Sequence, residues 1–273
     1  MPRFAANVSL LYPEWPFADR IAAAAADGFR AVECQFPYAV PAGTLAARLL
    51  DEGVSMVLLN APAGDWAGGE RGLAALPGRE AECRAGVERA LAYAQALGCP
   101  RVHLLAGVVP AGMGRDRAEA TYLAQLDWAA AQARAAGCEL LIEPLNAQDV
   151  PGYLLATQAQ AHALVQAVGA PNLRVQMDLY HVARTEGDVL AALTTWLPSG
   201  RVGHLQVAGV PGRHEPTGGP VDWPAVFARL DALAAAGAAP GWSGWVGAEY
   251  VPRAGAAPGG TSAGLGWLRP WRD

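Results

Sequence analysis

The sequence contains no lysine, and all 20 of its basic residues are arginine. Enzymes that form a Schiff base with a substrate carbonyl, or that attach pyridoxal phosphate, need a lysine amine. Those mechanisms and a lysine general base are therefore excluded. Cysteine is also scarce, and Cys34, Cys83, Cys99 and Cys138 lie too far apart for a zinc or redox motif. We expect them to be small buried apolar residues in a reducing cytoplasm.

Long apolar runs and a basic excess are missing as well. No apolar stretch approaches the roughly 20 residues needed to cross a bilayer. Pro13, Glu14 and Pro16 interrupt the N-terminal segment, which is too short in apolar residues for a signal peptide. We therefore expect a cytoplasmic protein with no membrane association. The formal net charge is −5 at pH 7, so nucleic acid is not expected as a partner.

The chain has 273 residues, of which 52% are hydrophobic and 16% charged, as suits a globular protein with a large core. Short apolar segments alternate with helical segments, and no linker divides them. The predicted strands cover 4–11, 31–36, 54–60, 101–105, 173–178, 202–207 and 244–249, with one more that ends at Glu143. The predicted helices cover 17–27, 42–52, 79–97, 115–136, 157–168, 188–196, 223–236 and 262–268. This alternation predicts a single (β/α)8 TIM barrel domain over residues 1–273.

Four of the predicted strands end in a side chain that carries oxygen: Glu143, Asp178, Gln206 and Glu249. A single acid at such a position more often caps a helix or pairs with an arginine. The C-terminal strand ends of a barrel form one site, however, and four successive units carry such a residue. Three carboxylates would repel one another without a cation, and an oxygen-only set favours Mg²⁺ or Mn²⁺. His204 shares a strand face with Gln206, so it could replace Gln206 as a ligand or lie one layer deeper.

Other polar and aromatic residues allow weaker expectations. His181 follows Asp178 by three residues and is expected to reach the same cavity. His103 is expected in a strand interior and His162 on a helix surface, and neither is given a role. The loops 61–78 and 208–221 are long and rich in glycine, as binding loops often are. Trp66 and Tyr38 could pack or contact a substrate.

The sequence resembles the hydroxypyruvate isomerase family of xylose-isomerase-like barrels along its whole length. The matching motifs are FAANVSLLY at 4–12, FPY at 36–38, NAPAGDWAGGERG at 60–72, PGRE at 77–80, IEPLN at 142–146, DLYH at 178–181, GHLQVA at 203–208 and GAEY at 247–250. Two departures concern the substrate. The chain has Gly209 and Thr217-Gly218-Gly219-Pro220 where many relatives carry acidic residues, and Leu59 where relatives often place a histidine.

The resemblance implies interconversion of hydroxypyruvate and tartronate semialdehyde, with a 2-oxo-tetronate isomerase or a ketose 3-epimerase as the alternative. It implies that Glu143 and Glu249 form the acid/base pair and bind the divalent metal together with Asp178 and Gln206. The family's chemistry passes through an enediolate whose negative charge needs stabilisation. Arg213 and Arg71 are the candidates for binding a substrate carboxylate, because the planar guanidinium can contact both oxygens. Asn60, His181 and His204 complete the expected substrate contacts.

Two other classes of function remain open at this stage. The same barrel supports metal-dependent endonucleases, although the acidic charge and the small number of histidines count against one here. A barrel that binds a sugar acid without turning it over would keep ligand affinity after Glu143→Gln and Glu249→Gln. The sequence leaves assembly into a homo-oligomer open.

Overall fold

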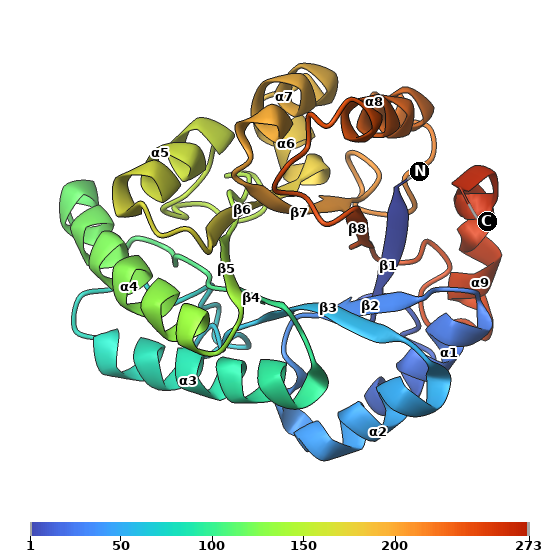
Figure 1. Cartoon of the computed structure of the whole chain (residues 1–273), viewed down its shortest axis with the longest axis horizontal. Helices are drawn as coiled ribbons and strands as arrows, with labels where there is room; N and C mark the ends of the chain where they lie inside the picture. Colours follow the sequence, from blue (N-terminus) through green and yellow to red (C-terminus); the bar gives the residue numbers. More distant parts are fainter. Residues whose placement is uncertain (1, 272–273) are drawn as a thin grey trace.

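A computed structural model describes residues 2–271 and confirms the predicted TIM barrel. Eight parallel strands close in chain order, since β1 pairs with both β2 and β8 (Figure 1). The strands are β1 Arg3–Asn7, β2 Ala31–Cys34, β3 Ser55–Asn60, β4 Arg101–His103, β5 Glu139–Ile142, β6 Leu173–Asp178, β7 Val202–Val207 and β8 Trp245–Ala248. Leu140, Leu141 and Ile142 of β5 are fully buried, as expected for a strand covered on both faces.

Helices surround the strands in a ring (Figure 1). They are α1 Arg20–Ala26, α2 Ala42–Glu52, α3 Glu80–Leu97, α4 Arg115–Ala135, α5 Gln158–Val168, α6 Leu179–Thr185, α7 Val189–Trp196, α8 Trp223–Ala235 and α9 Gly260–Gly264. Short 3-10 segments are η1 Phe17–Asp19, η2 Pro37–Ala39, η3 Leu197–Ser199 and η4 Leu265–Trp271. Most predicted helix ends agree with these bounds to within three residues. One extended apolar core fills the space between barrel and helices.

Two local expectations were wrong for identifiable reasons. Residues 179–185 form helix α6, which is missing from the predicted helices. The Asp178 side chain caps this helix by accepting a hydrogen bond from the Tyr180 backbone N–H at 2.9 Å. His162 lies buried in α5 with its ring stacked on Trp196, 4.3 Å between ring centroids, and so is not on the surface. Burial of an aromatic ring against a second ring outweighs the polarity that suggested exposure.

Backbone hydrogen bonds hold both long loops, 61–78 and 208–221, close to the ends of the strands. Gly72 forms an antiparallel bridge with Ala106 after β4, and its φ of 118° favours glycine. A Cβ at Gly72 would lie 2.4 Å from the Leu105 carbonyl oxygen, so a side chain there has no room. In the loop after β7, the Val251 backbone N–H donates to the carbonyl of Arg213 at 2.9 Å. This contact joins the loop after β7 to the segment after β8.

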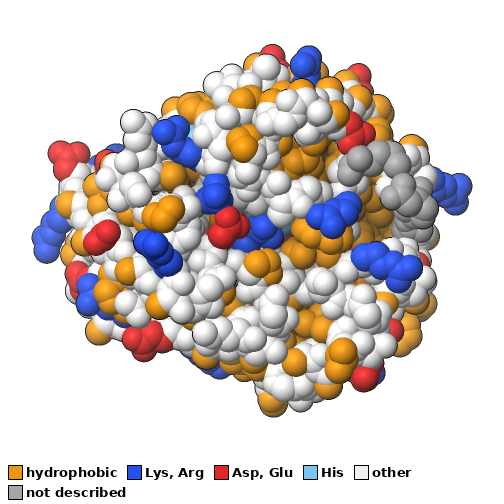
Figure 2. Space-filling view, viewed as in Figure 1, with side chains coloured by type: hydrophobic (Ala, Val, Ile, Leu, Met, Phe, Trp, Pro, Cys, Tyr) orange, Lys and Arg blue, Asp and Glu red, His pale blue; other side chains and the backbone are white. Residues whose placement is uncertain are grey.

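The composition gave expectations for the charged side chains on the surface and for the four cysteines. Figure 2 shows arginine and acidic side chains interspersed over the viewed face, rather than gathered by sign. None of the helices formed by residues 2–271 is both long and apolar enough to span a membrane. Cys34, Cys83, Cys99 and Cys138 are buried free thiols, as predicted.

Candidate active site

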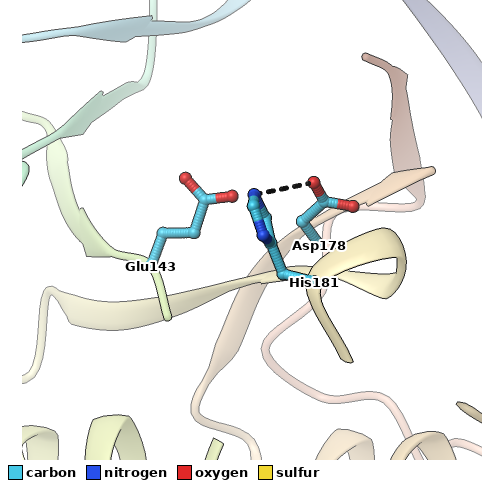
Figure 3. A group of neighbouring side chains, drawn as sticks. All are labelled: Glu143, Asp178 and His181. Atoms are coloured by element: carbon cyan, nitrogen blue, oxygen red, sulfur yellow. Dashed lines mark ion pairs between the residues drawn. The ribbon is translucent and has the colours of Figure 1, made fainter. Parts of the chain in front are cut away.

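The C-terminal ends of β5 and β6 bring two carboxylates and an imidazole together (Figure 3). Glu143 directly follows β5, Asp178 is the last residue of β6, and His181 lies in the first turn of α6. These three residues are at most 4% exposed. Each offers one possible ligand atom, and these atoms lie within 4.8 Å of one another. The strand ends therefore converge at one place, as the barrel fold predicts.

The two carboxylates are poorly paired without a cation. Glu143 Oε1 and Asp178 Oδ2 are buried and have no hydrogen-bond partner in residues 2–271. Burial and the neighbouring charges of Glu249 and Asp178 raise the pKa of Glu143 well above its usual range. Burial likewise raises the pKa of Asp178 to about 7, although Arg213 opposes this shift. Unpartnered, converging carboxylate oxygens are what a hard divalent cation binds, so the donor set fits the predicted metal.

Glu249 and Arg213 lie beside this pair. Glu249 directly follows β8 and is 5% exposed. The Arg213 guanidinium is 2.6 Å from Glu249 Oε2 and 3.6 Å from Asp178 Oδ2. Glu249 Oε1 accepts hydrogen bonds from Asn7 at 3.2 Å and Gln35 at 3.1 Å. Burial raises the pKa of Glu249, although the Arg213 charge and these donors stabilise its ionised form.

The surroundings of His181 indicate which of its ring nitrogens carries the proton. Asn146 directs its backbone N–H, at 3.0 Å, and its side-chain amide nitrogen, at 2.7 Å, towards His181 Nδ1. The Asn146 amide orientation follows from its Oδ1, which accepts from the backbone N–H groups of Gln148 and Asp149. Nδ1 therefore accepts, and the neutral ring carries its proton on Nε2. Metal-bound histidines show the opposite pattern, so in this arrangement His181 Nε2 is a hydrogen-bond donor rather than a metal ligand.

Gln206 and His204 lie on β7 and are almost completely buried. Gln206 accepts a hydrogen bond from Gln176 at 2.6 Å and donates one to Glu33 at 2.6 Å. His204 Nε2 is 2.6 Å from the other oxygen of Glu33. Asp178 pairs in register with Gln206, whereas His204 pairs with Gln176, two residues earlier on β6. His204 thus lies one layer deeper than the carboxylates, in the position that the sequence left as one of two options.

Two further residues predicted from the sequence to contact the substrate are Asn60 and Arg71. Asn60 ends β3 and pairs in register with His103 on β4. The guanidinium of Arg71 bonds the carbonyls of Trp66 and Glu70 in its own loop and stacks 4.0 Å from the Trp66 ring centroid. Within residues 2–271 no ion pair joins Arg71 to the clustered acids. Of the two candidate arginines, the structure brings Arg213 to the site.

Sequence reasoning missed two buried neighbours of the site. His103 was expected in a strand interior without a role, yet its Nδ1 lies 3.6 Å from Glu143 Oε2. Burial lowers the pKa of His103 to about 3, so the ring is neutral. Glu33 on β2 was not considered, although it is fully buried and bonded to Asn7, His204 and Gln206. The signal for Glu33 was a lone charged residue inside the apolar strand AVEC.

The chain is a closed parallel barrel with acids at the C-terminal ends of β5, β6 and β8, an arrangement consistent with the class of xylose-isomerase-like barrels. The sequence profile described as "Xylose isomerase-like TIM barrel" matches residues 21–271. The chain belongs to this family. The family resemblance read from the motifs is therefore confirmed.

Similar proteins carry the names of isomerases. A protein named 2-oxo-tetronate isomerase from Cupriavidus necator is 52% identical over 271 residues, with 99% of each chain covered. A protein named hydroxypyruvate isomerase from Escherichia coli is 40% identical over 272 residues and covers both chains fully. A crystal structure from Brucella melitensis, titled AP endonuclease, family 2, is 41% identical, with a TM-score of 0.91 over 100% of both chains. D-Psicose 3-epimerase from Clostridium cellulolyticum, at 17% identity and a TM-score of 0.76 over 99% of each chain, shares the fold.

Proposed function

We propose that the protein is a metal-dependent isomerase that moves the carbonyl of a small sugar acid by one carbon, with 2-oxo-tetronate as its substrate. The observation that carries the proposal is the cluster of buried acids, Glu143, Asp178 and Glu249, with Arg213 beside it. The choice of substrate rests on relatives named 2-oxo-tetronate isomerase at 52%, 42% and 40% identity. Hydroxypyruvate, the first choice from sequence motifs, is the second candidate because relatives of 40% and 43% identity carry that name.

The proposed reaction needs one group to remove a proton and another to return it. In 2-oxo-tetronate the carbonyl at C2 stands beside the carboxylate, so one proton must pass from C3 to C2 and the hydroxyl proton from the C3 oxygen to the C2 oxygen. Glu249 accepts three N–H hydrogen bonds that stabilise its ionised form, which suits a base. Glu143 Oε1 has no hydrogen-bond partner in residues 2–271, so this oxygen is available to deliver a proton to the substrate. We assign proton removal to Glu249 and proton delivery to Glu143 in this direction.

The acids would also hold the cation. Glu143, Asp178 and Glu249, with the amide oxygen of Gln206, form the proposed ligand set. When bound, Mg²⁺ or Mn²⁺ would polarise the substrate carbonyl and stabilise the negative charge of an enediolate. His181, which carries its proton on Nε2, would donate a hydrogen bond to a substrate oxygen. These side chains are buried, so a bound substrate would react away from bulk water.

The substrate choice is tested by measuring kcat/KM with Mn²⁺ for 2-oxo-tetronate, hydroxypyruvate and a free ketose. We expect the highest value for 2-oxo-tetronate, because its carboxylate can pair with Arg213 and its length matches the relatives' substrate. A higher value for hydroxypyruvate would replace the substrate but keep the mechanism. Turnover of the ketose alone would contradict a sugar-acid isomerase. Nicking of abasic DNA without any isomerase activity would favour the endonuclease reading over the proposal.

Arg213→Lys is expected to raise KM for the sugar acid by about tenfold or more. The arginine Nε–H is buried and has no partner in the described part of the chain, so this donor is available to an anionic substrate. Hydrogen bonds to charged groups contribute about 1.5–3 kcal/mol, and lysine cannot reproduce the planar pair of donors. Steady-state kinetics of Arg71→Lys provide the comparison, because Arg71 contacts its own loop. A larger rise in KM for Arg71→Lys than for Arg213→Lys would reverse the assignment.

A further inference from the structure

Glu33 is a buried carboxylate at the centre of a group of hydrogen bonds inside the barrel. It lies on β2 and is 0% exposed. Its Oε1 accepts from the amide nitrogens of Asn7 at 2.9 Å and Gln206 at 2.6 Å. Its Oε2 lies 2.6 Å from His204 Nε2. Both oxygens are therefore paired with nitrogen atoms from β1 and β7, which is what a buried carboxylate requires.

Strand β8, which is separated from β2 by β1, leaves space for this carboxyl group. Gly247 lies on β8, and a Cβ at this position would be 2.3 Å and 2.4 Å from the two oxygens of Glu33. These distances are too short for any side chain to share the space with Glu33. The absence of a side chain at Gly247 thus allows Glu33 to reach across the barrel to β7.

The contact with Glu33 determines which way the Gln206 amide faces. An ionised carboxylate only accepts hydrogen bonds, whereas an amide carries donors on nitrogen and acceptors on oxygen. Glu33 therefore holds the nitrogen of Gln206, and the amide oxygen turns towards β6, where it accepts from Gln176 at 2.6 Å. Asp178 is the register partner of Gln206 on that strand. An amide oxygen has two lone pairs, so one remains for a cation.

Glu33 also reaches a second proposed ligand through Asn7. The Asn7 amide nitrogen donates to Glu33 Oε1 at 2.9 Å and to Glu249 Oε1 at 3.2 Å. One carboxyl group thus orients the side chains that contact both the β7 and the β8 end of the site. Groups that orient metal ligands in this way commonly change metal affinity when they are replaced.

We propose that Glu33 is a positioning residue for the metal site: it holds Gln206 with its amide oxygen directed towards the cation and, through Asn7, orients Glu249. This inference rests on the proposed function, in which Gln206 is a ligand. Within residues 2–271, the side chain of Glu33 forms its hydrogen bonds with Asn7, His204 and Gln206 and none with Glu143 or Asp178. Its role is to remove the ambiguity of a glutamine ligand, which could otherwise present nitrogen to the cation.

The test is the affinity for Mn²⁺, measured by isothermal titration calorimetry on the full chain. We expect Glu33→Gln to weaken Mn²⁺ binding by about 10- to 100-fold, the usual effect of losing an orienting partner. A glutamine at this position can donate to the Gln206 oxygen and turn the amide round. Glu139→Gln is the matched control, because Glu139 pairs with Arg101 and Arg174 at the other end of the barrel. That control is expected to keep the wild-type affinity even if Tm falls.

A double-mutant cycle separates positioning from a general loss of packing. In a Gln206→Ala background, Glu33→Gln is expected to cause no further loss of affinity beyond about twofold, because its main effect acts through Gln206. Equal losses in both backgrounds, or an unchanged affinity in Glu33→Gln, would overturn the proposal. If Glu33→Gln does not fold, Gly247→Ala gives the same test, since its Cβ displaces the Glu33 carboxyl group.

The same titration distinguishes this inference from the proposed function. A wild-type protein that binds no Mn²⁺ would overturn both, because no metal site would exist to be oriented. Wild-type binding that Glu33→Gln and Gly247→Ala leave unchanged would overturn the role of Glu33 alone. The proposed isomerase function would then stand.

Discussion

Glu143→Gln is expected to lower kcat for the sugar acid by about 10²- to 10⁴-fold, the range that a positioned acid or base contributes. Glutamine keeps the shape of the side chain but can neither hold nor deliver the proton. Its stability should not fall, because burial raises the pKa of Glu143 and the fold therefore disfavours its charge. A thermal melt of the metal-free protein should give a Tm equal to or above that of the metal-free wild type. Low activity would then have a chemical cause.

The control for this prediction lies on the same strand. Glu139 begins β5 at the opposite end of the barrel, so Glu139→Gln should retain kcat within about twofold while it loses the ion pairs with Arg101 and Arg174. Proton exchange provides a second measurement. In D₂O, Glu143→Gln should still exchange the substrate proton at C3, because Glu249 remains as the base. Full turnover by Glu143→Gln, or loss of exchange together with turnover, would contradict the division of roles between the two glutamates.

Removal of divalent metal is expected to abolish turnover reversibly and to lower Tm. Exhaustive chelation would leave Glu143, Asp178 and Glu249 facing one another, with Arg213 as the arginine that residues 2–271 place against them. Restoring a ligand at 100 times its Kd stabilises the folded state by about 2.7 kcal/mol. Differential scanning calorimetry with and without Mn²⁺, paired with the activity assay, measures both effects. Full activity after chelation, verified by metal analysis, would refute the metal-dependent mechanism.

The metal effect should also depend on pH. Burial raises the pKa of Asp178 to about 7 in the metal-free site, so the carboxyl group gains a proton as the pH falls below that value. Protons then compete with the cation, and the increase in Tm caused by Mn²⁺ should be smaller at pH 5.5 than at pH 7.5. Asp178 alone should make the Tm of the metal-free protein higher at pH 5.5 than at pH 7.5. A raised pKa means that ionisation opposes folding, and this cost appears as the pH rises from the unfolded value of about 4 towards 7.

The sequence alone predicted the barrel and the acids at its strand ends because both depend on local patterns. Each apolar strand followed by Glu143, Asp178 or Glu249 can be recognised within a few residues, and the barrel topology then brings the strand ends together. The same reasoning could not assign a role to Glu33. Its partners Asn7, His204 and Gln206 are 26, 171 and 173 residues away, and only the closed barrel brings them into contact.

Local sequence patterns also could not distinguish Arg213 from Arg71 or indicate which nitrogen of His181 carries the proton. Arg71 and Arg213 are both in glycine-rich loops, and nothing in their immediate sequence distinguishes them. The contact between Val251 and the Arg213 carbonyl, which comes from a distant part of the chain, places Arg213 against Glu249. Likewise, the proton position on His181 depends on Asn146, which reaches the ring from the end of β5.

Glu143 and Asp178 each have a buried oxygen without a hydrogen bond in residues 2–271, and this has a consequence for engineering the barrel. Groups that an active site needs for its chemistry often lower the free energy of unfolding. Two buried, mutually repelling acids are an example. A screen for heat resistance alone would therefore select apolar replacements at these positions. The selected proteins would have a higher Tm but no catalytic activity. Thermostabilising libraries should leave both acids fixed and vary the helix surfaces instead.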